Sequence, residues 1–88
     1  MDNKAILDEL LDVLEKNGVA LRHEAMGGGG SGLCKVKDRE LFFVDTQSQT
    51  IETAQSCALA VNEVVDIESV YIRPEVRRFI ENCIGVNK

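Results

Sequence analysis

The stretch GVALRHEAMGGGGSGLCKVKDRELFFVD, residues 18–45, decides the fold, because its hydrophobic pattern predicts three β-strands in succession. Apolar and polar residues alternate over Val19–Glu24 and over Leu33–Lys37, as on half-buried strands. A polar tetrad after the second strand favours a tight turn into a third, Glu40–Asp45. Four consecutive apolar residues, Leu41 to Val44, predict that the third strand is buried on both faces and lies centrally in the sheet.

Helices are predicted on both sides of this stretch. Asp2–Lys16 carries aliphatic residues at helical spacing, a second helix begins at Thr50, and a third covers Pro74–Ile84, where proline suits a first helical position. Between the last two, the β-prone triplet Val70–Ile72 predicts an edge strand. We therefore expect an α+β fold in one compact domain, residues 1–88, in the order α-β-β-β-α-β-α. Its small sheet should be mostly antiparallel, with helices on one face.

Length, charge and cysteine spacing exclude several classes of protein. Eighty-eight residues suffice for one domain, and a formal charge of −5 argues against a nucleic-acid partner. No apolar run approaches the roughly 20 residues that span a membrane, and no leader opens the chain, so we expect a cytoplasmic protein without a membrane partner. Cys34, Cys57 and Cys83 lie 23 and 26 residues apart. Because no C-x-x-C pair exists, we expect free thiols, no metal site and no cofactor.

The glycine cluster is the one unusual feature of the composition. Gly27, Gly29 and Gly32 satisfy the spacing G-x-G-x-x-G, but a strand follows them where dinucleotide binding requires a helix. No Lys-Ser/Thr follows either, which excludes a Walker-type loop. We interpret residues 26–32 as a flexible connector between two strands. The alternative is a loop whose amides, at Gly28, Gly29 and Gly30, bind an anion.

Two side chains beside the loop are further candidates for ligand or interaction residues. His23 and Cys34 would face each other if their strands paired as a wide hairpin, and a histidine can activate a thiolate. Without an orienting third residue or an oxyanion donor, a surface histidine and a strand-face cysteine are the plainer interpretation. Asp45 and Glu63 adjoin core segments, and we expect both to be solvated. We assign no catalytic residue.

The order of segments from Gly18 to Val65 resembles the amino-terminal half of bacterial zinc-peptidase-like domains of the ImmA/IrrE type. The matching pieces are Asn17-Gly18-Val19-Ala20-Leu21, Gly32-Leu33-Cys34-Lys35-Val36, Leu41-Phe42-Phe43-Val44-Asp45 and the helix from Thr50. That family carries H-E-x-x-H on this helix. Here Val61-Asn62-Glu63-Val64-Val65 takes its place, so the resemblance implies a metal-free scaffold without zinc-peptidase activity. The chain is also similar to small proteins common in bacterial genomes.

These observations favour a non-catalytic module that acts through a protein partner or as a homo-oligomer, since a short chain with β-prone strands has edges that need covering. The alternative is a small-molecule or anion-binding protein that uses the Gly27–Gly32 loop. A third hypothesis, an enzyme with Cys34 as nucleophile, has the least support.

Overall fold

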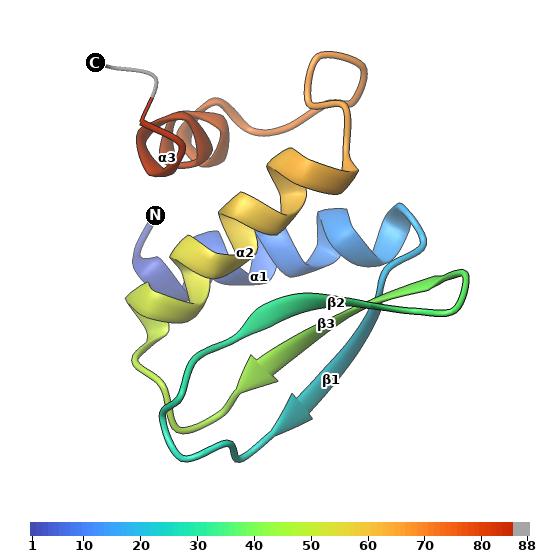
Figure 1. The fold of residues 1–88 in the computed structure, drawn as a ribbon. Coiled ribbons are helices and arrows are strands. Elements are labelled where there is room, and N and C mark those ends of the chain that lie inside the picture. Colours follow the sequence, from blue (N-terminus) through green and yellow to red (C-terminus); the bar gives the residue numbers. More distant parts are fainter. Residues whose placement is uncertain (86–88) are drawn as a thin grey trace.

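The computed structural model describes residues 1–85 and is drawn in Figure 1. Its first helix begins at a capping residue and buries a stripe of aliphatic side chains. Helix α1 spans Asn3–Lys16, and the Asp2 carboxylate accepts a hydrogen bond from the Ala5 amide at 2.9 Å, as an N-cap does. The helix ends before Gly18, whose φ of 90° is a left-handed conformation that favours glycine.

The three predicted strands form a mixed sheet. Strand β1 spans Ala20–Glu24, β2 spans Gly32–Val36 and β3 spans Arg39–Asp45, in the spatial order β1-β3-β2. The central position predicted for the third strand is confirmed. β2 pairs with β3 antiparallel, but β1 pairs with β3 parallel, so the sheet is not mostly antiparallel. The reason is that the chain reverses between β1 and β2 and again between β2 and β3, which returns β3 to the direction of β1.

The glycine-rich loop crosses the end of the central strand. Because β1 and β2 lie on either side of β3, residues 25–31 join strands that are two spacings apart, about 10 Å. The loop therefore passes over the carboxyl end of β3, at Asp45 (Figure 1). This crossing brings the glycine cluster to the residue that ends the central strand.

The helices lie on one side of the sheet, as expected. Helix α2 spans Thr50–Val64 and packs with α1 against the strands, while α3, Pro74–Cys83, packs on those two helices (Figure 1). The face that α2 buries consists mostly of small side chains: Thr53, Ala54, Cys57, Ala58, Ala60 and Val61. None of the helices within residues 1–85 is long and apolar enough to cross a membrane.

The edge strand expected at Val70–Ile72 is absent. This segment runs over the helices toward α3, away from the sheet (Figure 1), so none of the strands in the described part of the chain lies beside it. Ile72 is buried in the core, whereas Tyr71 is 84% exposed. The Arg77 guanidinium donates to the Ile67 carbonyl at 3.0 Å and holds the preceding loop against α3.

The apolar run of β3 is buried on one face only. Phe42 and Val44 point into the core with Leu10 and Leu14 of α1, whereas Leu41 and Phe43 are half-buried on the other face. The prediction of burial on both faces is therefore wrong, because α1, α2 and α3 lie on the same side of the sheet (Figure 1). The single compact domain is confirmed, with a Cα radius of gyration of 12.3 Å.

Candidate functional site

The carboxylate of Asp45 organises the glycine-rich loop. It accepts hydrogen bonds from the Met26 amide at 3.0 Å and the Gly30 amide at 3.1 Å, both in the loop that crosses above it. It also accepts hydrogen bonds from the Gln47 amide and the Ser48 hydroxyl, which follow Asp45 in the chain, each at 3.0 Å. Four donors therefore converge on one side chain at the carboxyl end of β3.

The prediction that Asp45 is solvated is wrong. Its side chain is only 1% exposed, because the loop covers it. Burial acts to raise the pKa of this carboxyl, but the hydrogen bonds from the amides of Gln47, Gly30 and Met26 and from the Ser48 hydroxyl outweigh it, and the pKa falls to about 2. Asp45 is thus held as a buried, fully partnered carboxylate.

Further hydrogen bonds fix the two ends of the loop. The Ser31 hydroxyl accepts from the Asp45 amide at 2.9 Å and lies 3.4 Å from the Thr53 hydroxyl of α2. Near the start of the loop, the Gly27 amide donates to the Gln47 side-chain oxygen at 2.5 Å. The connector therefore has a defined, hydrogen-bonded conformation in the structure, while its flexibility stays a prediction.

The loop amides are engaged within the chain. The Gly30 amide donates to Asp45, and the Gly29 amide donates to the Met26 carbonyl at 3.3 Å. That last bond closes a turn whose central residues, Gly27 and Gly28, both have positive φ, as type I′ turns require. Of the three candidate glycines only Gly28 has an amide without a partner in residues 1–85. An external anion would therefore compete with the Asp45 carboxylate for this loop.

The structure does not bring His23 and Cys34 together. β1 and β2 lie on opposite sides of β3, so the wide hairpin that would pair them does not form. His23 is the Cα partner of Val44 and lies on the helix side, whereas Cys34 is the partner of Leu41 and lies on the opposite face. A Cys–His couple is therefore absent at these positions.

His23 instead lines a small hollow at the carboxyl ends of the parallel strands. The hollow has a volume of about 230 Å³ and lies between α1 and the start of α2. Lys4 contributes a cation, although it already pairs with Asp8 at 3.3 Å, and Thr46 and Thr50 contribute hydroxyls. Sheets with parallel strands commonly bind ligands at this end.

The three cysteines are free thiols in different surroundings. Cys34 is exposed, Cys57 is buried and Cys83 is half-buried. Burial raises the pKa of Cys57 to about 12 and also raises that of Cys83. Within residues 1–85, no three histidine, cysteine or acidic side chains cluster as metal ligands would.

The helix compared with the zinc-peptidase motif carries no metal ligands at the histidine positions. Val61 and Val65, which take those places, are both buried in the core. Glu63 is exposed on the helix, as predicted.

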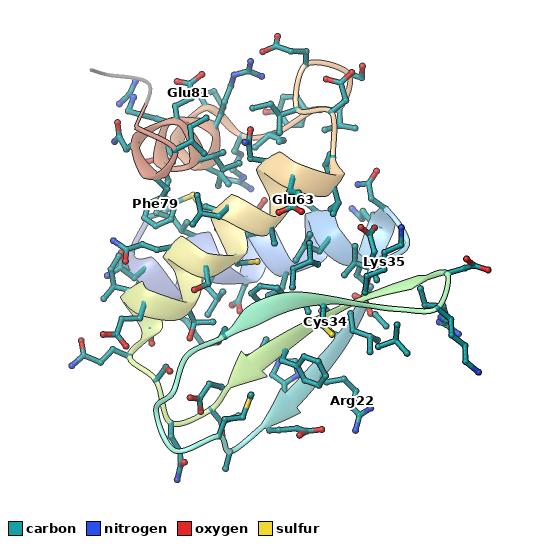
Figure 2. All side chains as sticks on the ribbon, viewed as in Figure 1. Arg22, Cys34, Lys35, Glu63, Phe79 and Glu81 are labelled. Carbon is teal, nitrogen blue, oxygen red and sulfur yellow. The ribbon has the colours of Figure 1, made fainter. Side chains whose placement is uncertain are left out.

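Sequence analysis did not identify a further candidate surface, the uncovered face of the sheet. On β3 it carries Leu41, which lies between Ala20 and Cys34, and Phe43, which lies between Arg22 and Gly32. Leu41 and Phe43 thus form an apolar ridge along the central strand, and their neighbours on β2, Cys34 and Gly32, are small. We call this the open face and define it by Ala20, Arg22, Gly32, Cys34, Val36, Leu41 and Phe43. Figure 2 shows Arg22 and Cys34 on the side away from the helices.

The hairpin end of the open face is hollowed. A shallow depression of about 560 Å³ is lined by Val36, Arg39, Leu41 and the turn residues 37–38. Val36 is 46% exposed. The available signal in the sequence was the apolar run of β3, Leu41 to Val44. Such a run needs a cover on both faces of the sheet, and the helices within residues 1–85 cover only one face.

No protein-family model, curated protein or solved structure matches this chain.

Proposed function

We propose that the chain is a non-catalytic protein-interaction module, and that the open face is its contact surface. The observation that carries this proposal is the ridge of Leu41 and Phe43, half-buried and left without a cover by the rest of the described chain. Apolar side chains on a sheet face that no helix covers are typical of a protein contact. The exposed thiol of Cys34 on the same face is consistent with a reducing, cytoplasmic location, which belongs to the proposal.

A photo-cross-linker placed in the ridge tests the proposal. Phe43 is replaced in cells by p-benzoylphenylalanine, an aromatic side chain that suits the site, and Phe79 on α3 is replaced as the matched control (Figure 2). We expect a discrete cross-linked adduct from position 43 and none from position 79. Absence of any adduct from position 43 contradicts the proposal.

A pair of exposed residues shows whether the adduct depends on the open face. Val36 is 46% exposed on this face and Leu59 is 49% exposed on α2. We expect Val36→Glu to abolish the adduct, because it places a charge in the contact, and Leu59→Glu to leave it in place. Equal effects of the two substitutions would show that the cross-linked adduct does not depend on the open face.

The second candidate function is binding of a small molecule or anion, and the hollow beside His23 supports it. Lys4 and His23 lie there near the first turn of α2, where backbone amides favour negative charge. The acidic residues Asp8 and Asp45 line the same hollow, where Asp8 pairs with Lys4 and Asp45 accepts hydrogen bonds from the glycine-rich loop. Thermal unfolding in the presence of inorganic phosphate, nucleotides or phosphorylated metabolites tests this. Binding raises the midpoint in the wild type and less in Lys4→Ala, whereas no shift at millimolar ligand contradicts it.

A further inference from the structure

The outer edge of β2 is free to pair. Within residues 1–85, β2 is bonded only to β3, through a hairpin with the two-residue turn 37–38. In such a hairpin the closing residues, Val36 and Arg39, form a hydrogen-bonded pair, and the pattern alternates from there along the strand. The backbone N–H and C=O groups of Leu33 and Lys35 therefore point outward, away from β3.

The two edges of the sheet differ in their protection. On β1, three polar or charged residues follow one another, and Arg22 pairs with Glu24 at 2.8 Å. Charged side chains of this kind discourage pairing at an exposed edge. β2 has one charged residue, Lys35, and its side chain lies on the helix side of the sheet (Figure 2).

A groove runs between the β2 edge and α2. It has a volume of about 250 Å³, and Leu33, Leu59, Ala60 and Glu63 are among its lining residues. Leu59 leaves 49% of its surface exposed there. Glu63 stands on the same side of the sheet as Lys35 (Figure 2), and neither side chain has an ion-pair partner within residues 1–85.

We propose that two copies of this chain pair through their β2 strands, antiparallel about a two-fold axis at Cys34. This register sets Leu33 of each copy opposite Lys35 of the other, so the outward backbone groups of both residues are used. Each Lys35 then enters the groove of the other copy, where Glu63 supplies the opposite charge. A register centred on Lys35 would instead oppose two lysines, which is unfavourable.

That the partner at the β2 edge is a second copy of this chain follows from the match between Lys35 and the groove. One groove and one lysine on the same edge make the surface self-complementary, as a two-fold interface must be. The pairing yields a continuous six-stranded sheet, since each copy supplies three strands, and it joins the two open faces into one. The inference goes beyond the proposed function, because the dimer uses the β2 edge and the groove beside α2, whereas the proposed contact with other proteins uses the open face.

Charge reversal in purified protein tests the dimer. Lys35→Glu and Glu63→Lys should each shift the chain to a monomer in sedimentation, because each homodimer then opposes like charges. Mixing the two variants should restore a dimer, since positions 35 and 63 then carry opposite charges in both interfacial pairs. Lys37→Glu and Glu52→Lys make the same charge changes on the turn and elsewhere on α2, and should leave the wild-type dimer intact.

Cys34 offers an independent readout of the register. On the proposed axis the two cysteines form a non-hydrogen-bonded pair with Cα atoms about 4.5 Å apart, within the range for a disulfide. Diamide, which takes up the two hydrogens of the thiols, should give a covalent dimer through an S–S bond. Cross-linking should be lost in Cys34→Ser and in Lys35→Glu, and should return in the mixture of charge variants.

The outcomes separate this inference from the proposed function. The dimer is overturned if the wild type sediments as a monomer at protein concentrations up to about 1 mM, because a dissociation constant above that value is too weak for a specific interface. It is also overturned if the dimer survives both charge reversals. Neither result alters the adduct expected from position 43, which lies on the central strand and not at the edge. Conversely, a Cys34-linked dimer without that adduct keeps the dimer and rejects the open face as a contact for other proteins.

Discussion

The carboxylate of Asp45 accepts a hydrogen bond from the amide of Gly30 at 3.1 Å, across 15 positions of the chain. This contact joins the central strand to the loop that crosses its end. It also explains why a glycine is needed there, since Gly30 has a φ of 108°. The loop and the strand therefore stabilise each other.

Acid should weaken the fold through Asp45. Its pKa is about 2 in the folded chain against an ordinary 3.8, so the carboxylate contributes stability above pH 4 that is lost as the pH falls toward 2. We expect the free energy of unfolding, measured by urea titration, to fall over this window in the wild type. Asp45→Asn should be less stable at pH 7 and should show a flatter dependence. Parallel curves for the two proteins would contradict this role.

The loop glycines should differ in their tolerance of alanine. Gly30→Ala places a Cβ at positive φ and should cost about 1–2 kcal/mol. Gly32→Ala is the control, because its φ is not positive and an added Cβ meets no atom within 4 Å. It should change stability by about 0.5 kcal/mol or less. Similar losses in the two variants would show that conformation is not the cause.

The thiols should react at different rates. Cys34 is exposed, whereas burial raises the pKa of Cys57 to about 12. Native protein treated with a thiol reagent should therefore show one fast-reacting cysteine, assigned to position 34 by mass spectrometry. Cys57 should react only on unfolding, and fast labelling at position 57 would argue against the buried core described above.

Replacing His23 should leave the Cys34 thiol unchanged. The two residues lie on opposite faces of the sheet and on different edge strands. His23→Gln is expected to give the same alkylation rate at Cys34 as the wild type from pH 6 to pH 9. A rate that falls in the variant would restore the idea of an activated thiol.

The core should be sensitive at α1. Leu10 is fully buried, and Leu10→Ala should cost about 2–5 kcal/mol in chemical denaturation. Leu59→Ala removes the same atoms from a side chain that is 49% exposed, and should cost about 0.5 kcal/mol or less. The difference between the two variants measures the burial of α1.

Local patterns predicted the elements but not their neighbours. The starts of the helices at Thr50 and Pro74 match the structure, because apolar periodicity and the special geometry of proline are local properties. The parallel pairing of β1 was not predicted, since it depends on which edge of β3 remains free after the hairpin has formed. The segment Val70–Ile72 has strand propensity, yet the path of the chain over the helices leaves it unpaired.

The candidate site shows the same limit. The interest of the glycine cluster was evident from composition, but its partner, Asp45, lies 15 positions beyond Gly30 and was expected in solvent. The available signal was an acidic residue at the end of an apolar strand, with Gln47 and Ser48 two and three positions after it. The open face arises because nothing in residues 1–85 forms a layer over Leu41 and Phe43, and only the arrangement of the helices in Figure 1 reveals that.

The sheet topology also predicts the order in which the strands pair during folding. Val36 and Arg39 are three positions apart in the chain, whereas Ala20 and Leu41 are 21 apart. A hairpin forms in about 1–10 μs, and distant strands join only after the entropy of the intervening loop has been overcome. Glycines raise that entropy, so we expect β1 to dock after the β2–β3 hairpin. The hydrogen bonds from the glycine-rich loop to Asp45 then form when β1 joins a β2–β3 hairpin that already exists.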